Sequence, residues 1–423
     1  MKHLVFADTN HAGLFAIRTA KALGYRVGLV RSPDFRPLYA GPLADEVLSQ
    51  VDRIVDVEDS TDEDQLLQAL AALDAEAPVD GAVAVMEYTS LPLARAAERA
   101  GIRATPRRAV ELARDKQACR RALEAAGIAS ARHARVDRLG EALAAAASIG
   151  YPVVVKPVSG AGSLLAARID DDRAMEAYFA RHDALLARLP RGMARAAGGS
   201  LLVEEHLDGP LLSVEIGAAR GRILRFMVSG RKRGSHNEIL ELGTTMPAGI
   251  PAPARAGAFA YAEAIVRTLG LDLGIFHIEV ILTATGPRLV EVNPRLMGAS
   301  LPTLYRHATG VDIHAFLARI HVGEAVEDPP ADALRAATSR VTAAAVDATV
   351  RADLAPDWLA PFAPHLVEHA IRVRPGQALP AMISNHESFG YFQVVADDPA
   401  ASADLGDRLV RGIGEALGVR LAD

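Results

Sequence analysis

The chain has 423 residues, of which 50% are hydrophobic and 23% charged, so we expect a globular protein with two to four domains. Its net charge of -6 gives no reason to expect a nucleic-acid partner, and no apolar run reaches the ~18 residues that would span a membrane. A single cysteine, Cys119, excludes an internal disulfide and is typical of a reducing, cytoplasmic location.

The first part of the chain alternates strands and helices, which is typical of a parallel sheet. Strands are expected at residues 3–7, 26–30, 53–57 and 81–85, and helices at 14–23, 62–75 and 90–100. The N-terminal residues therefore indicate a strand and not a signal peptide. The first turn, residues 8–13, lacks the G-x-G-x-x-G pattern of a dinucleotide site. The sequence predicts a Rossmann-like domain without a bound dinucleotide.

A predicted helix at residues 107–126, capped by Gly127, leads into a second region of mixed α and β structure. There an apolar run from Tyr151 delivers Lys156, and the small-residue loop 159–163 follows. Glycines in such a loop let backbone amides approach an anion, and a lysine on an apolar strand is rarely buried without one. The pattern indicates a phosphate site, although an ordinary hairpin turn would also explain the loop.

The segment Leu201–Leu207 is an apolar strand that runs into two acids, Glu204 and Glu205, before a Gly-Pro turn. This composition suits a linker between two subdomains, whose exposed backbone could pair with the edge of an adenine. A plain surface turn is the alternative interpretation.

Residues 277–295 predict two strands joined by a short turn. With the turn centred on Thr285, the pairs 282/288, 280/290 and 279/291 lie opposite one another, and Glu279 faces Glu291 across the ladder. Asn293 points to the same side. Like charges directly opposite are destabilising, and a Mg²⁺ ion would reverse that penalty. The alternative is a solvated face that carries two unrelated acids.

Beyond residue 330, strands are expected at 339–346, 366–373 and 390–396, with a closing helix at 404–417. These residues predict a small α+β appendage.

Taken in order, four elements resemble the ATP-grasp superfamily of carboxylate–amine ligases over roughly residues 107–322. They are Asp115-Lys116, Val155-Lys156 with its glycine-rich loop, Glu204–Leu207, and Glu279 with Glu291-Val-Asn293-Pro-Arg295. The resemblance implies a Rossmann-like N-terminal domain (1–110), an ATP-grasp fold of two α+β subdomains (central or lid 111–205, catalytic 206–328) and a C-terminal α+β appendage (329–423).

The resemblance also implies the roles of individual residues. It assigns ATP binding to Lys116, Lys156, Ser159, Gly160, Gly162, Ser163, Glu204, Glu205 and Leu207. It makes Glu279, Glu291 and Asn293 ligands of two Mg²⁺ ions, with Mn²⁺ as an alternative metal, and Arg295 the catalytic arginine beside the acyl-phosphate.

The implied reaction forms an amide bond from a carboxylate and an amine through an acyl-phosphate, with release of ADP and phosphate. Within the superfamily, residues 235–247 resemble a stretch of the bacterial L-amino-acid (dipeptide) ligases. Candidate substrate residues are Glu241, Ser235, His236 and Gly298. Two positions depart from the pattern: Thr244 replaces a substrate-binding histidine, and Leu211 stands where relatives have a ribose-binding acid, for which Glu215 or Asp208 could compensate.

Other functions on the same scaffold remain open. A carboxylase or purine-pathway ligase is one, although the chain has no biotin-carrier motif, and a non-catalytic nucleotide-binding relative is another. Small-molecule substrates are expected, with neither nucleic acid nor membrane as partner, and the C-terminal appendage would either close over the substrate or form a homodimer contact. The histidines near the predicted cleft, His236, His277 and His307, match no zinc signature.

Overall fold

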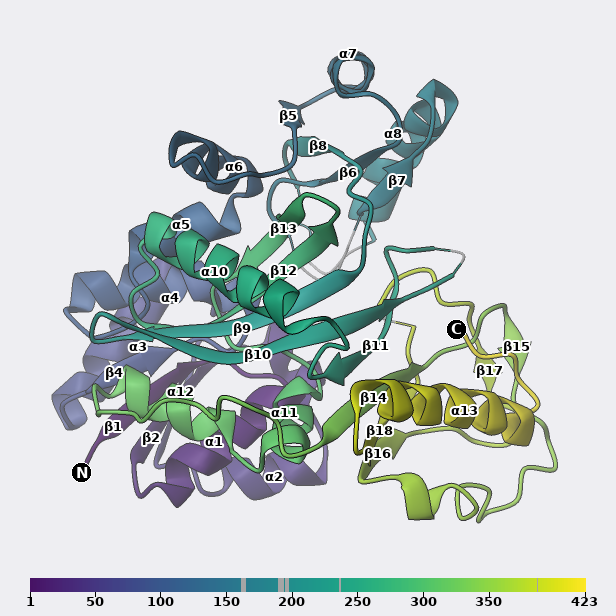
Figure 1. The fold of residues 1–423 in the computed structure, drawn as a ribbon. Helices are drawn as coiled ribbons and strands as arrows, with labels where there is room; N and C mark the ends of the chain where they lie inside the picture. Colours follow the sequence, from purple (N-terminus) through teal and green to yellow (C-terminus); the bar gives the residue numbers. More distant parts are fainter. Residues whose placement is uncertain (161–164, 189–193, 195–197, 236, 386) are drawn as a thin grey trace.

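The computed structural model describes residues 1–160, 165–188, 194, 198–235, 237–385 and 387–423 (Figure 1). Three of the predicted site residues, Gly162, Ser163 and His236, lie outside these ranges. No helix in the described part of the chain is long and apolar enough to cross a lipid bilayer.

The N-terminal region forms a four-stranded parallel sheet in the order β3-β2-β1-β4, as the alternation of elements predicted. Its strands are fully buried at positions such as Val5 and Leu29, which is typical of a parallel sheet covered on both faces. The elements are β1 (His3–Ala7), α1 (His11–Ala22), β2 (Arg26–Arg31), the 3-10 helix η1 (Pro33–Tyr39), α2 (Pro42–Leu48), β3 (Arg53–Asp56), α3 (Glu63–Glu76), β4 (Gly81–Val83) and α4 (Glu87–Ala100).

The single helix predicted at residues 107–126 is wrong, because the chain forms two helices there. They are α5 (Arg107–Arg114) and α6 (Lys116–Ala125), and Asp115 separates them with an extended backbone. The Asp115 side chain accepts a hydrogen bond from the backbone N–H of Ala118 at 2.8 Å, so it caps the start of α6. Lys116 is therefore the first residue of a new helix.

The central region is a separate four-stranded antiparallel sheet in the order β5-β8-β6-β7 with two helices packed on it. Figure 1 shows it standing away from the rest of the molecule. Its elements are β5 (His133–Val136), α7 (Leu139–Ile149), β6 (Val153–Pro157), β7 (Ala167–Ile169), α8 (Asp172–Leu186) and β8 (Leu201–Glu205).

An eight-stranded antiparallel sheet in the order β13-β12-β9-β10-β11-β14-β18-β16 forms the body of the protein. The residues predicted as a C-terminal appendage supply its last three strands, so they continue the sheet. The strands are β9 (Leu211–Ala219), β10 (Arg222–Arg233), β11 (Glu241–Met246), β12 (Gly274–Thr283), β13 (Gly286–Asn293), β14 (Ala336–Thr342), β16 (Glu368–Ile371) and β18 (Gly390–Ala396). A short pair, β15 (Ala348–Thr349) and β17 (Ala378–Leu379), and the 3-10 helix η2 (Ala363–His365) lie beside it.

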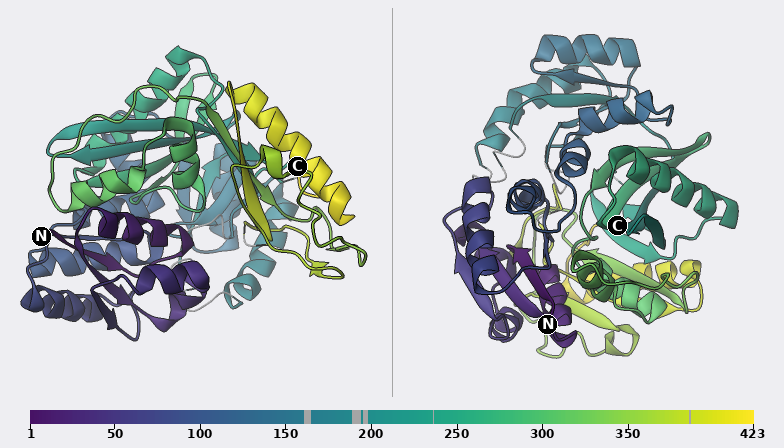
Figure 2. Two further views of the ribbon diagram at one scale, coloured as in Figure 1. Left: turned by 90° about the horizontal axis from the view of Figure 1, so that it is seen from below. Right: turned by 90° about the vertical axis from the view of Figure 1, so that its left-hand side faces the viewer.

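The two faces of this large sheet are covered differently (Figures 1 and 2). Helices α10 (Ala252–Leu269) and α13 (Pro399–Leu417) pack on one face, α10 against apolar side chains such as Val214 and Ile278 and α13 against Val394. The opposite face meets α11 (Leu301–Thr309), α12 (Ile313–His321) and the N-terminal region. Because successive side chains of a strand alternate between faces, this second face also receives the polar residues Ser213, Glu215 and Glu279.

Candidate active site

The hairpin of β12 and β13 brings Glu279 directly opposite Glu291, as predicted. The register then shifts between Glu279 and Val280, so that Val280 pairs with Leu289 and Leu282 with Pro287. The predicted pairs 280/290 and 282/288 are wrong, because β13 contains one extra residue at Val290.

The bulge leaves the Val290 carbonyl oxygen outside the regular ladder. It accepts hydrogen bonds from Arg120 Nη2 at 2.7 Å and from Lys156 Nζ at 3.2 Å. A local irregularity of the hairpin therefore connects it to two cationic side chains from α6 and β6.

Glu291 lies among groups that favour its charged form. Lys116 Nζ is 3.3 Å from its Oε2 atom, and Asn293 Nδ2 donates a hydrogen bond to its Oε1 atom at 3.1 Å. Burial alone would raise the pKa of the Glu291 carboxyl, but the charge of Lys116 and the bond from Asn293 hold it well below its ordinary value. This carboxylate is ionised at neutral pH.

Glu279 is held by a buried histidine. His277 Nε2 is 3.1 Å from Glu279 Oε1, and His277 Nδ1 is 2.5 Å from Glu215 Oε1. Burial would lower the pKa of His277, but Glu215 and Glu279 raise it to about 10. His277 lies two residues before Glu279 on β12, so both side chains point to the same face of the sheet. Glu215 is fully buried beneath this histidine, so the suggestion that it replaces the ribose acid is wrong.

A second cluster of buried charges lies next to the hairpin. Glu204 accepts from Arg120 Nε at 2.8 Å and lies 2.5 Å from Lys156 Nζ, and all three residues are buried. Burial would raise the pKa of Glu204, but Arg120 and Lys156 outweigh it and lower the pKa to about 2. Arg120 was not among the predicted site residues, although its place four residues after Lys116, on one face of α6, indicated that the two side chains lie together.

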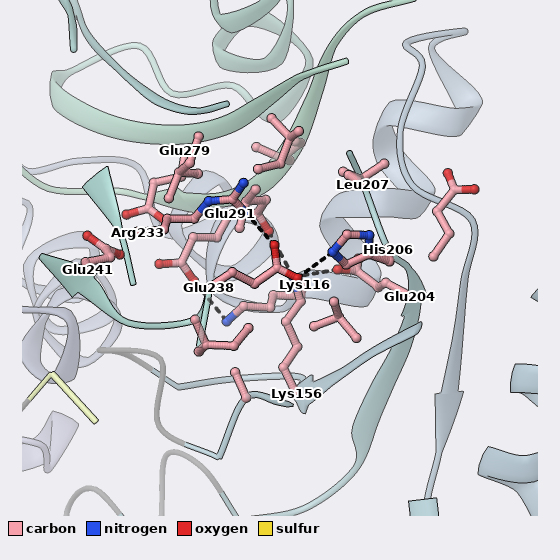
Figure 3. A pocket seen from close by; sticks show the side chains of 18 of the residues that line it. Lys116, Lys156, Glu204, His206, Leu207, Arg233, Glu238, Glu241, Glu279 and Glu291 are labelled. Carbon is pink, nitrogen blue, oxygen red and sulfur yellow. Dashed lines mark hydrogen bonds and ion pairs between the residues drawn. The ribbon is translucent and has the colours of Figure 1, made fainter. Parts of the chain in front are cut away.

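Lys116, Lys156 and both hairpin acids line one pocket, which is drawn in Figure 3. Val154, Ile281 and Leu289 supply apolar walls, which suit a flat aromatic ring. Of the other predicted residues, this pocket is also lined by Gly160, Glu204, Glu205, Leu207 and Glu241. Ser159, Asn293, Arg295 and Gly298 are not among its lining residues, and Ser235 lines a neighbouring cavity that shares Glu238 with this pocket.

The pocket that Leu211 lines also contains a carboxylate from another segment. Glu238, which precedes β11, lines the pocket and bonds His206 Nε2 at 2.6 Å and Arg233 Nη1 at 3.0 Å. Asp208, the other suggested replacement for the ribose acid, is exposed and lines no part of this pocket. Sequence reasoning missed Glu238 because it reaches the pocket from a loop, far from Leu211 in the chain.

Arg295 lies just beyond the end of β13 and contacts the N-terminal region. Its Nη2 atom forms an ion pair with Glu87, and its Nη1 atom donates to the Leu296 carbonyl at 2.6 Å. The side chain is 12% exposed, and its Nε atom has no acceptor among the described residues. The predicted catalytic arginine is thus held by a carboxylate of α4.

A second, larger cavity of about 840 Å³ adjoins the pocket. Glu241 lines both, so the two spaces meet at this side chain. Glu241 forms an ion pair with Arg231, which also lines the larger cavity.

The donor set of the hairpin fits a magnesium ion. Glu279, Glu291 and Asn293 offer oxygen atoms from one rigid face, which is what this ion prefers. Within the described residues no group of three or more His, Cys, Asp or Glu side chains is placed to hold a metal by itself. The set is therefore incomplete in the way expected of a site that shares its ion with substrate phosphates.

Comparisons with known proteins agree with this geometry. Residues 149–303 match the family model of the ATP-grasp domain, and residues 17–102 match that of the ATP-grasp N-terminal domain. The chain is 28% identical over 225 residues to carnosine synthase 1 of Gallus gallus, covering 51% of this chain and 24% of that one. It is 31% identical over 147 residues to alanine–anticapsin ligase of Bacillus subtilis, covering 35% of this chain and 31% of that one.

Among solved structures, the L-amino acid ligase of Bacillus licheniformis superposes with a TM-score of 0.78 at 18% identity, over 100% of this chain and 98% of that one. This likeness confirms the predicted fold class. The chain spans less than two thirds of the length of these curated relatives.

Proposed function

From its ATP-grasp domain and the N-terminal domain that precedes it, we propose that this protein is an ATP-dependent carboxylate–amine ligase that joins amino acids or amino-acid-like substrates. One observation carries the proposal: two acids, Glu279 and Glu291, face each other in a pocket that two lysines, Lys116 and Lys156, also line. A site that only bound a nucleoside would have no use for this concentration of opposite charges.

The pocket suits ATP from one end to the other. The apolar walls at Ile281 and Leu289 take the adenine ring, and the segment 204–207 offers backbone groups to its edge. Lys116 and Lys156 line the pocket and bind the phosphates, whose negative charge they offset. When ATP binds, Lys156 could replace its ion pair with Glu204 by one with a phosphate oxygen, so that it has an anionic partner both with and without the nucleotide.

Glu279, Glu291 and Asn293 would hold Mg²⁺ between the hairpin and the phosphates. When bound, the ion supplies positive charge that offsets the charge of the phosphoryl group. His277 fixes the position of the Glu279 carboxylate, because its ring contacts both Glu215 and Glu279.

The proposed reaction has two steps. A carboxylate oxygen attacks the γ-phosphorus of ATP, the bond to the bridging oxygen breaks, and ADP leaves. An amine then attacks the carbonyl of the acyl-phosphate, phosphate leaves, and the amine nitrogen loses a proton. Arg295 contributes a fixed guanidinium for the charge that develops on the phosphoryl and carbonyl oxygens. Catalysis is then mainly positioning and electrostatics.

Nucleotide products test this proposal directly. The purified protein is incubated with ATP, Mg²⁺ and pooled amino acids, and ADP, AMP, phosphate and pyrophosphate are quantified while products are identified by mass. We expect ADP and phosphate only when an acid and an amine are both present. AMP with pyrophosphate would refute the proposal, and bicarbonate-dependent turnover without amino acids would show a carboxylase instead.

A further inference from the structure

The larger cavity is built from three parts of the chain. His11 and the segment around Leu38 come from the N-terminal region, Thr244 and Ser339 from the large sheet, and residues 377–380 and 387–391 from the C-terminal part. Its volume of about 840 Å³ lies in the range of small-molecule sites. The space is therefore large enough for an amino acid next to the nucleotide pocket.

A β-bulge brings two opposite charges onto the cavity face of the sheet. Arg231 pairs with Thr244 and Lys232 with Gly243, but the next pair is Arg233 with Glu241, so Leu242 is the extra residue. Without this bulge, the alternation of side chains would send Glu241 to the other face. With it, Glu241 and Arg231 form an ion pair on one wall, 17% and 10% exposed.

The guanidinium of Arg231 is only partly satisfied by the protein. Its Nη2 atom pairs with Glu241, while Nε and Nη1 are shielded and have no acceptor in the part of the chain that the structure describes. Shielded donors of this kind normally have a partner. A planar guanidinium with free N–H groups is matched by a carboxylate.

We propose that Arg231 binds the free carboxylate of the amino acid that supplies the amine, and that Glu241 binds its ammonium group. This assignment rests on the proposed ligase function. An α-amino acid carries one charge of each sign, so its entry exchanges the Arg231–Glu241 pair for two pairs with the substrate. Because Glu241 also lines the nucleotide pocket, the amino group lies on the side where the acyl-phosphate forms.

The carboxylate at Arg231 is not the one that becomes phosphorylated. A guanidinium fork engages both carboxylate oxygens, whereas the reacting carboxylate needs a free oxygen at the γ-phosphorus. The rest of the lining indicates the side chain of the substrate. Leu38, Leu301, Leu379 and Phe389 all border the cavity, which favours an amino acid with an apolar side chain.

The test compares an apolar amino acid with its α-amide as amine donor, in wild-type protein, Arg231→Gln and Arg231→Lys. Wild-type protein should prefer the free acid by roughly 100-fold in kcat/KM, because the amide leaves the guanidinium unpaired. Arg231→Gln should lose this preference, and Arg231→Lys should keep part of it, since it retains the charge without the fork. Lys232→Met is the matched control: Lys232 pairs with Asp407 on the opposite face, so this variant should keep the preference.

The possible results separate the two claims. If no amine supports ADP release, the proposed ligase function is refuted. The role of Arg231 is then tested by calorimetry with the same amino acid, which should bind to wild-type protein and not to Arg231→Gln. If ligation occurs but wild-type protein uses acid and amide equally, or Arg231→Gln retains the preference, the assignment of Arg231 is overturned while the ligase function stands. Thermal melting of each variant shows whether it is folded. If Arg231→Gln does not fold, the partial loss of preference expected for Arg231→Lys still tests the assignment.

Discussion

Arg295 and Glu87 form a buried ion pair that joins the end of the β12–β13 hairpin to the first turn of α4. The two side chains are 12% and 13% exposed, so the pair is largely shielded from water. Arg295 follows a strand of the large sheet, whereas Glu87 belongs to the N-terminal region. The ion pair therefore forms only when these two regions pack together. The proposed catalytic arginine is thus positioned by the domain that precedes the nucleotide site.

Glu87→Gln should lower kcat by at least roughly tenfold and change the KM for ATP by less than about twofold. Glutamine keeps the size of the side chain but removes the charge that fixes Arg295, whose role is confined to the reacting groups. Steady-state kinetics at saturating substrates check this. Glu98→Gln on the same helix is the control, because Glu98 pairs with Arg107 at the surface. A rise in the KM for ATP without a change in kcat would refute the positioning role.

Glu291→Gln should reduce turnover by roughly 100-fold or more while the protein stays folded, because it removes an anionic metal ligand without changing volume. ADP release and thermal melting are measured on the same preparation. Glu263→Gln, which removes the surface ion pairs of this α10 residue with Arg225 of β10 and Arg267, should behave as wild type. Full activity of Glu291→Gln would remove the basis for the metal site.

Lys156→Met should raise the KM for ATP by roughly tenfold or more, since the nucleotide phosphates lose a charged partner on the pocket wall. Nucleotide titrations of initial rate give the value. The comparison is Lys21→Met, whose side chain pairs with Asp52 in the N-terminal region. Unchanged nucleotide kinetics would count against the phosphate role of Lys156.

Arg120→Met should destabilise the fold by about 3–5 kcal/mol near pH 7, because Glu204 stays buried with one of its cations removed. The sign of the pH dependence follows from the pKa of Glu204, which is about 2 in the folded protein and below its unfolded value. Its contribution is present above the unfolded pKa and is lost as the pH falls toward 2. The free energy of unfolding, measured by urea denaturation, should therefore decrease as the pH is lowered through this window, and it should decrease less for Arg120→Met than for wild-type protein. Equal slopes against pH for the two proteins would contradict the prediction.

Gly81→Ala should destabilise the protein by roughly 1–3 kcal/mol. A Cβ atom at Gly81 would lie 2.2 Å from the His321 carbonyl oxygen, so β4 would have to move away from α12. Gly140→Ala in α7 is the matched control, because a Cβ there meets nothing within 4 Å, and it should be neutral or stabilise by about 0.5–1 kcal/mol. Chemical denaturation distinguishes the two variants.

What the amino-acid sequence determined is local. The alternating N-terminal strands and helices, and the opposition of Glu279 and Glu291, depend on periodicity and on a short turn, which act over few residues. Even there the bulge at Val290 escaped prediction, because its carbonyl is held by Arg120 and Lys156 from other elements. A local pattern does not contain those partners.

Only the tertiary structure decided which distant groups meet. Glu204 and Arg120 are 84 positions apart, and Glu87 and Arg295 lie in different parts of the fold. The Leu242 bulge, which places Glu241 beside Arg231, depends on how β10 and β11 pair within an eight-stranded sheet. Pairings of this kind follow from the packing of whole elements, so a sequence that specifies each element well still leaves them undecided.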